Sequence, residues 1–182
     1  MDKVCVFFAT GFEEIEALTV VDLLRRAQIE TMMVSVTGSR NVTSSHNIMV
    51  MTDALLEDIC FDDVTALVLP GGMPGTTNLE ACIPLMDQVD KFYKDEKIVA
   101  AICAAPSILG HKGMLQGRNA CSFPDFESHL EGAVVTHNSV EISDHVITSR
   151  GMGCAIDFGL AIVAKLLGES KAEELADKII YR

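Results

Sequence analysis

Short apolar segments alternate along this chain with segments of helical periodicity, and this alternation restricts the fold more than any other feature. Residues 3–9, 66–69 and 98–102 are apolar almost throughout, as strands are when helices cover both faces of a parallel sheet. Residues 15–27 and 83–94 carry apolar side chains at helical spacing. We therefore predict an α/β fold whose doubly wound, mostly parallel sheet is sandwiched between helices.

The other segments fit the same plan. Residues 31–36 and 146–148 predict further strands, residues 42–51 a hairpin, and residues 154–167 an apolar helix. The chain has 182 residues and shows neither an internal repeat nor a shift in composition. We predict a single domain over residues 1–182.

Composition and charge restrict the partners and the compartment. A hydrophobic content of 49% with 22% charged residues suits a folded protein with a sizeable core. The net charge of −12 disfavours nucleic acid and anionic membrane surfaces as partners. No apolar run is long enough for a transmembrane helix, and residues 4–9 are too short for a signal peptide. The sequence predicts a cytoplasmic protein.

Six cysteines are scattered without the CxxC spacing of zinc or redox motifs. In a reducing compartment such cysteines are free thiols rather than a disulfide framework. We expect no metal site and no cofactor. The six are Cys5, Cys60, Cys82, Cys103, Cys121 and Cys154.

Cys103 differs from the others because it lies where a predicted strand turns into a helix, in IVAAICAAPSILG. A thiol at such a turn is exposed by a sharp corner and faces free helix N–H groups. Both effects favour a pKa below the ordinary value of ~8.5. Most free cysteines are small buried hydrophobes instead, and the residues alone leave both interpretations open.

Two other loops, at the ends of other predicted strands, carry groups that suit a cysteine site. Glu13 and Glu14 are interpreted as solvated caps of the helix that follows. Glu16 lies among apolar neighbours, so an inward, protonated carboxyl is an alternative to a solvated one. After the strand 66–69, Gly72 can present a bare N–H which, with that of Ala104, would form an oxyanion site.

The stretches FFATGFEEIEAL, LVLPGGMPGTTNL, AAICAAPSIL and ITSRGMGCAIDFGLAIV, in this order and spacing, resemble the ThiJ/PfpI superfamily. The resemblance is greatest to its DJ-one branch with the bacterial YajL-type relatives. It implies a flavodoxin-like fold and a homodimer. It also implies that Cys103 is the reactive nucleophile, that Glu16 is its protonated hydrogen-bond partner and that Gly72 and Ala104 supply the oxyanion amides. Arg26 matches an arginine at the dimer-side rim of the pocket.

Three positions depart from the family pattern. Phe123 stands where animal members have a histidine near the cysteine, which leaves Glu16 as the evident acid and base. His46 stands where those members have a second pocket arginine. Ala104 follows the cysteine directly, where protease-like members have a histidine, so a protease is not expected.

The resemblance implies two functions that share one thiol. The first is a stress-response enzyme acting on small reactive carbonyls, either a glyoxalase III-like lyase independent of glutathione or a deglycase-type hydrolase. The alternative is a redox-sensing or chaperone-like protective protein that uses oxidation of Cys103 with little turnover. The expected partner is therefore a small carbonyl compound or an oxidant.

Overall fold

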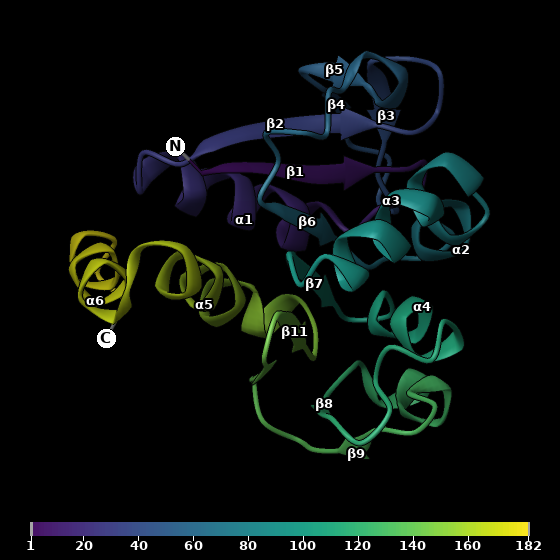
Figure 1. Cartoon of the computed structure of the whole chain (residues 1–182). Coiled ribbons are helices and arrows are strands. Elements are labelled where there is room, and N and C mark those ends of the chain that lie inside the picture. The colour runs from purple at the N-terminus through teal and green to yellow at the C-terminus, as the bar shows by residue number, and fades with distance from the viewer. Residues whose placement is uncertain (1, 182) are drawn as a thin grey trace.

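The computed structural model describes residues 2–181 and has a seven-stranded sheet at its centre (Figure 1). All neighbouring strands are parallel except the edge pair β10 and β11. The doubly wound, mostly parallel sheet predicted from the sequence is therefore confirmed. Its strands, in spatial order, are β10 (Val140–Ser143), β11 (Val146–Ser149), β7 (Ile98–Ile102), β6 (Ala66–Leu69), β1 (Lys3–Phe8), β2 (Glu30–Ser35) and β5 (Ala54–Leu55).

Helices cover both faces of the sheet, each burying its apolar side against the strands. One face is covered by α1 (Glu14–Arg26) and α5 (Ala155–Leu167), and α6 (Glu169–Lys178) packs against α5. The other face is covered by α2 (Gly75–Glu80), α3 (Ile83–Lys94) and α4 (Pro106–His111).

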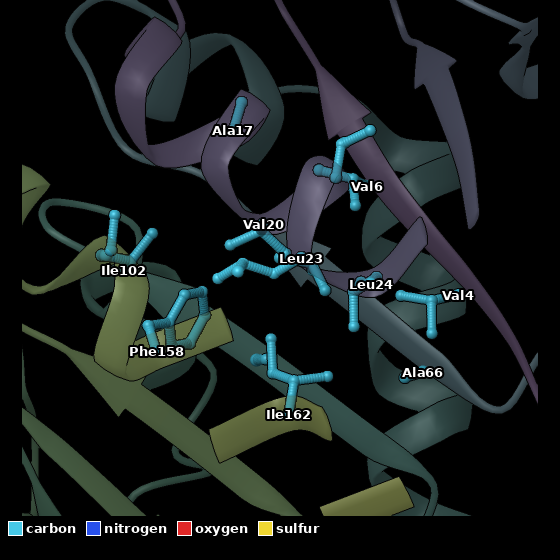
Figure 2. Close-up of a cluster of buried hydrophobic side chains, with 14 of the residues drawn as sticks. Val4, Val6, Ala17, Val20, Leu23, Leu24, Ala66, Ile102, Phe158 and Ile162 are labelled. Carbon is cyan, nitrogen blue, oxygen red and sulfur yellow. The ribbon is translucent and has the colours of Figure 1, made fainter. Parts of the chain in front are cut away.

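Alternate side chains of each strand enter two different cores, as the period of two in a strand requires. Val4 and Val6 of β1 pack with α1 and α5, where Phe158 is a large, fully buried member (Figure 2). Gly159 allows α1 and α5 to approach closely, because a Cβ there would lie 2.5 Å from Cδ1 of Leu23. Cys5 and Phe7 point to the opposite core under α3 and α4.

The smaller elements lie at the margins. β3 (Asn41–Thr43) and β4 (Met49–Met51) form the predicted hairpin. β8 (Asn119–Ala120) and β9 (Val134–Val135) pair with each other outside the main sheet. Three 3₁₀ helices complete the elements, η1 (Leu56–Asp58), η2 (Pro124–His129) and η3 (Met152–Cys154). The sequence did not predict α2 (Gly75–Glu80), β5 (Ala54–Leu55) or β10 (Val140–Ser143).

The strand order reverses between β1 and β6, since the chain builds outward to β2 and β5 before it crosses to β6 and β7. In such sheets the crevice at the carboxyl ends of the strands beside the reversal is where ligands bind. Within residues 2–181 we find no helix with the length and apolar character needed to cross a bilayer. All six cysteines are free, as predicted.

Candidate functional site

Three loops meet at the carboxyl ends of β1, β6 and β7, beside the point where the strand order reverses. The loop after β1 leads into α1 and carries Glu16. The loop after β6 contains Gly71 and Gly72, and the strand β7 ends directly before Cys103. The structure thus brings together three segments that the sequence places far apart.

The first two loops contact each other through their backbones. The N–H of Glu13 donates to the carbonyl of Gly71 at 2.9 Å, and the N–H of Gly75 donates to that of Gly11 at 3.1 Å. Gly72 has a φ of +90°, and a Cβ on it would lie 2.4 Å from the nitrogen of Glu13. A side chain at this position would therefore separate the loops.

Cys103 has a φ of +65°. This left-handed conformation is unfavourable in free energy for any residue that has a side chain. Two hydrogen bonds stabilise this conformation. Its N–H donates to the carbonyl of Ser149 at 2.9 Å, and its own carbonyl accepts from the N–H of Phe123 at 2.8 Å. Cys103 is only partly buried, so the corner presents the thiol to small molecules.

Glu16 lies in the first turn of α1 and is 1% exposed, so its side chain points inward. Its Oε2 accepts a hydrogen bond from the N–H of Gly71 at 2.9 Å. The carboxyl also interacts with the thiol of Cys103, and its Oε1 has no hydrogen-bond partner among the described residues by distance and angle. One carboxyl therefore links the loop after β6 to the cysteine.

The backbone N–H groups of Gly72 and Ala104 both hydrogen-bond to the Cys103 sulfur. These two N–H groups come from different loops. They are the two donors that the family resemblance implied for an oxyanion site. Two N–H donors directed at one atom stabilise negative charge on it or on an oxygen bound next to it. The site can therefore accommodate an oxyanion.

Burial shifts the pKa values of both side chains in this pair. Burial raises the pKa of Glu16 to about 7. Burial, and after it the negative charge of Glu16, raises the pKa of the Cys103 thiol to about 12, against the lowering effect of the Gly72 and Ala104 N–H groups. Of the two interpretations that the sequence left open, the lowered thiol pKa is not found, because burial and a neighbouring carboxylate outweigh two amides. Glu16, rather than Cys103, titrates near neutral pH.

Phe123 and Gly151 form the outer side of the site. Phe123 is 42% exposed. A Cβ on Gly151 would lie 3.6 Å from Cδ2 of Phe123 and 4.0 Å from both the Cys103 sulfur and Oε1 of Glu16. Gly151 thus borders the reacting groups, although the sequence analysis did not select it. Gly151 lies in the stretch ITSRGMGCAIDFGLAIV, just after the strand β11. This position near the carboxyl end of a strand was the sequence signal that could have identified it.

Arg26 and His46, which the resemblance placed at the pocket, lie away from the thiol of the same chain. Arg26 is in the last turn of α1 and pairs with Asp22 at 2.6 Å, whereas Glu16 is in the first turn. It lines a separate hollow of about 580 Å³ together with Leu18 and Ile179. His46 lies in the loop between β3 and β4, with its Nδ1 2.9 Å from Oε1 of Glu14.

Glu13 and Glu14 correct a further expectation. They were predicted to be solvated, but they are only 9% and 7% exposed. Glu13 is indeed the N-cap of α1, since its Oε2 accepts from the N–H of Glu16 at 2.7 Å. Burial raises the pKa of Glu13 above its ordinary value. The β3–β4 loop covers this turn, which the local sequence did not indicate.

Comparison with known proteins shows the family of this chain. The family described as the DJ-1/PfpI family matches residues 2–165. The chain belongs to it. "Protein DJ-1 homolog B" of Arabidopsis thaliana is 36% identical over 99% of this chain, and the chain spans only 42% of that relative. "Glutathione-independent glyoxalase DJR-1.2" of Caenorhabditis elegans is 30% identical over 90% of this chain and 87% of its own.

A solved member of the DJ-1/PfpI family has the same fold. The structure described as "Toxoplasma gondii DJ-1, oxidized" matches with a TM-score of 0.95 and 31% identity, covering 100% of this chain and 99% of its own. The flavodoxin-like α/β architecture is therefore that of the DJ-1/PfpI family.

The raised pKa of Glu16 makes the stability of the fold depend on pH. The folded state keeps the proton up to about pH 7, while the unfolded chain loses it near 4.5. The contribution of Glu16 to the free energy of unfolding is therefore fully present below pH 4.5. It falls by about 3 kcal/mol as the pH rises to about 7. Urea unfolding of Glu16→Gln between pH 4.5 and 8 should show a weaker fall than the unaltered chain.

The exposed Glu57 provides a matched control, since Glu57→Gln makes the same change on the surface. This variant should follow the pH dependence of the unaltered chain. If Glu16→Gln also follows it, the carboxyl of Glu16 does not retain its proton in the folded state.

Proposed function

We propose that this chain converts small 2-oxoaldehydes such as methylglyoxal into hydroxy acids without glutathione. Cys103 acts as the nucleophile and Glu16 as the acid and base. One observation carries the proposal: the Cys103 sulfur, a carboxyl whose pKa is about 7 and two N–H donors meet at a partly exposed corner. The Caenorhabditis elegans relative described as a glutathione-independent glyoxalase supports this choice.

The first step is addition of the thiol to the aldehyde. The carboxylate of Glu16 removes the proton of the Cys103 thiol while the sulfur forms a bond to the aldehyde carbon. The carbonyl oxygen becomes an oxyanion, for which the N–H groups of Gly72 and Ala104 are suitable donors. Glu16 then returns the proton to this oxygen, which gives a neutral hemithioacetal and a free carboxylate.

The second step moves a proton between adjacent carbons. The carboxylate of Glu16 removes the hydrogen from the former aldehyde carbon and returns it to the neighbouring carbon of the resulting enediolate. The hydroxyl proton on the oxygen of the first carbon moves to the oxygen of the second. The product is a lactyl thioester on Cys103. Water cleaves its carbon–sulfur bond and releases lactate and the thiol. Methylglyoxal and one water thus become lactic acid, and no external oxidant or reductant is consumed.

The side chain of Phe123 leaves this mechanism without an imidazole at the rim of the site. A carboxyl with a pKa near the working pH can accept and donate protons at comparable rates. Glu16 therefore has the property that a histidine would otherwise provide. A deglycase-type hydrolysis would start from a hemiaminal: the Cys103 sulfur bonds to the carbon while the carbon–nitrogen bond breaks. The amine leaves with a proton from Glu16, and the same hemithioacetal results.

The two reacting side chains should be indispensable for turnover. Cys103→Ser removes the nucleophile, and Glu16→Gln removes the acid and base without changing the shape of the side chain. We expect each to lower kcat/KM for lactate formation from methylglyoxal by about 10²–10⁴-fold. The exposed Cys60 supplies the control, and Cys60→Ser should retain full activity. Full activity in either site variant would refute the mechanism.

A second candidate function is redox sensing, which one relative supports by its oxidised structure. Peroxide would oxidise the Cys103 thiolate to sulfenate with release of water, and a second peroxide would give sulfinate. The new oxygens would accept hydrogen bonds from Gly72, Ala104 and protonated Glu16. The raised thiol pKa argues against rapid oxidation, because the thiolate is the reactive form. We therefore rank carbonyl chemistry first.

Mild peroxide treatment separates the two functions. If Cys103 is a sensor, intact mass spectrometry should show the gain of two oxygens on the unaltered chain and none on Cys103→Ser. Exposed Cys60 is the internal comparison, because its oxidation reports accessibility alone. Oxidation of Cys60 before Cys103 would contradict the sensor function and leave the enzymatic one intact.

We also propose that the partner of the chain is a second copy of itself. Ile15, Ile48 and Met49 are 48%, 48% and 67% exposed. Ile48 and Met49 follow a loop that backbone hydrogen bonds tie to Gly11 and Phe12, just before the helix that carries Ile15. Exposed apolar side chains on two joined segments are typical of an interface.

Sedimentation equilibrium tests this dimer. The unaltered chain should sediment as a dimer at micromolar concentration, and Met49→Glu should shift it towards the monomer. Ile83→Glu places the same charge on an exposed isoleucine elsewhere and should leave the dimer intact. A monomer throughout, or equal effects of both variants, would contradict this interface.

The compartment we propose is the cytoplasm. Six free cysteines, of which Cys60 is exposed, support a reducing environment.

A further inference from the structure

We propose that Glu13, Glu14 and His46 form a binding site for a divalent transition-metal ion of the Zn²⁺ type. One ligand atom from each of these side chains lies within 4.8 Å of the others. The two carboxyls come from the start of α1, and the imidazole comes from the loop between β3 and β4. Their spacing in the sequence is not that of a metal motif, and the site arises only when the hairpin folds over the helix.

Among the described residues, no lysine or arginine compensates the charge of these carboxyls. Both glutamates are at least nine-tenths buried, and a buried carboxylate is costly unless a cation or several donors face it. Within residues 2–181, the ion pairs of the structure bring neither a lysine nor an arginine to Glu13 or Glu14. His46 approaches Glu14, with its Nδ1 2.9 Å from Oε1. The side chain of Ser44 and the backbone N–H of Glu14, both uncharged, also hydrogen-bond to this carboxyl. A divalent cation would supply the missing positive charge.

A separate observation points to a ligand at the same place. Oε2 of Glu14 is completely buried and has no hydrogen-bond partner among the described residues. The side chain that carries it is only 10% exposed. Buried carboxylate oxygens in native proteins nearly always have a partner. The carboxyl that faces His46 therefore has an unused acceptor in a position that solvent does not reach.

The three side chains are positioned without an ion. The N–H of Ser45 donates to the carbonyl of Phe12 at 2.8 Å, and the N–H of Gly11 donates to that of Thr43 at 2.8 Å. These bonds fix the hairpin loop over the start of α1. The N–H of His46 donates to Oγ of Ser44 at 3.3 Å. An ion would therefore need only small side-chain rotations to bind.

The donor set selects the kind of ion. Two carboxylate oxygens and one imidazole nitrogen suit Zn²⁺ and similar borderline ions, whereas Ca²⁺ and Mg²⁺ prefer oxygen alone and Cu⁺ prefers sulfur. His46 is exposed, with 68% of its side chain accessible. Three protein ligands leave a fourth position for water or a small anion.

The test is zinc binding to the whole chain, measured by competition with a chromogenic chelator. We expect one Zn²⁺ per chain. His46→Ala and Glu14→Gln should each weaken the binding at least tenfold, and circular dichroism should show an unchanged fold. The matched control is His111→Ala. His111 also pairs with a glutamate, with its Nδ1 2.6 Å from Oε1 of Glu80, but it lies on α4 outside the proposed site.

Cys103→Ser distinguishes this site from zinc bound by the nearby thiol. The variant should bind zinc like the unaltered chain, and Co²⁺ in place of Zn²⁺ should give visible bands without the near-ultraviolet thiolate charge-transfer band. Loss of binding in Cys103→Ser with retention in His46→Ala would overturn the proposal. So would the absence of any binding at micromolar zinc, or equal loss in His111→Ala.

Discussion

The backbone contact between the loops after β1 and β6 is the constraint on which the site depends. The bond from the N–H of Glu13 to the carbonyl of Gly71 joins these loops where the strand order reverses. It fits only because Gly72 lacks a Cβ, which would lie 2.4 Å from the Glu13 nitrogen. With the loops joined, the carboxyl of Glu16 reaches the N–H of Gly71 and the thiol of Cys103 together. A small separation would break both contacts.

The chemistry follows from one proton shared by a buried carboxyl and a partly buried thiol. Burial disfavours two negative charges at neighbouring positions, so Glu16 and Cys103 do not both ionise near neutral pH. When an aldehyde binds, the sulfur can form a bond to it while the thiol proton moves to the carboxyl. The two negative charges then never occur together. The left-handed conformation of Cys103 keeps the sulfur at the corner where this can occur. Strain and burial thus favour base-assisted addition over a permanently ionised thiolate.

Most of the fold could be predicted from the sequence, because buried parallel strands are apolar throughout. The strand Ile98–Ile102 and the helix Ile83–Lys94 were predicted with the bounds that the structure has. Short elements such as α2 and β10 were not predicted, because their form depends on neighbours in space. For the site, the sequence located Cys103 and, through the family resemblance, Glu16. The pKa of the thiol depends on burial and on a charge from another loop, which no local pattern shows.

Three glutamates within one helical turn show why local sequence could not assign their roles. Glu13 caps the helix through the N–H of Glu16, Glu14 faces His46, and Glu16 turns to the thiol. The residue type and the helix are the same in each case. The β3–β4 loop covers two of these side chains, and the loop after β6 covers the third. The tertiary contacts of each carboxyl, rather than its position at a helix start, therefore determine its chemistry.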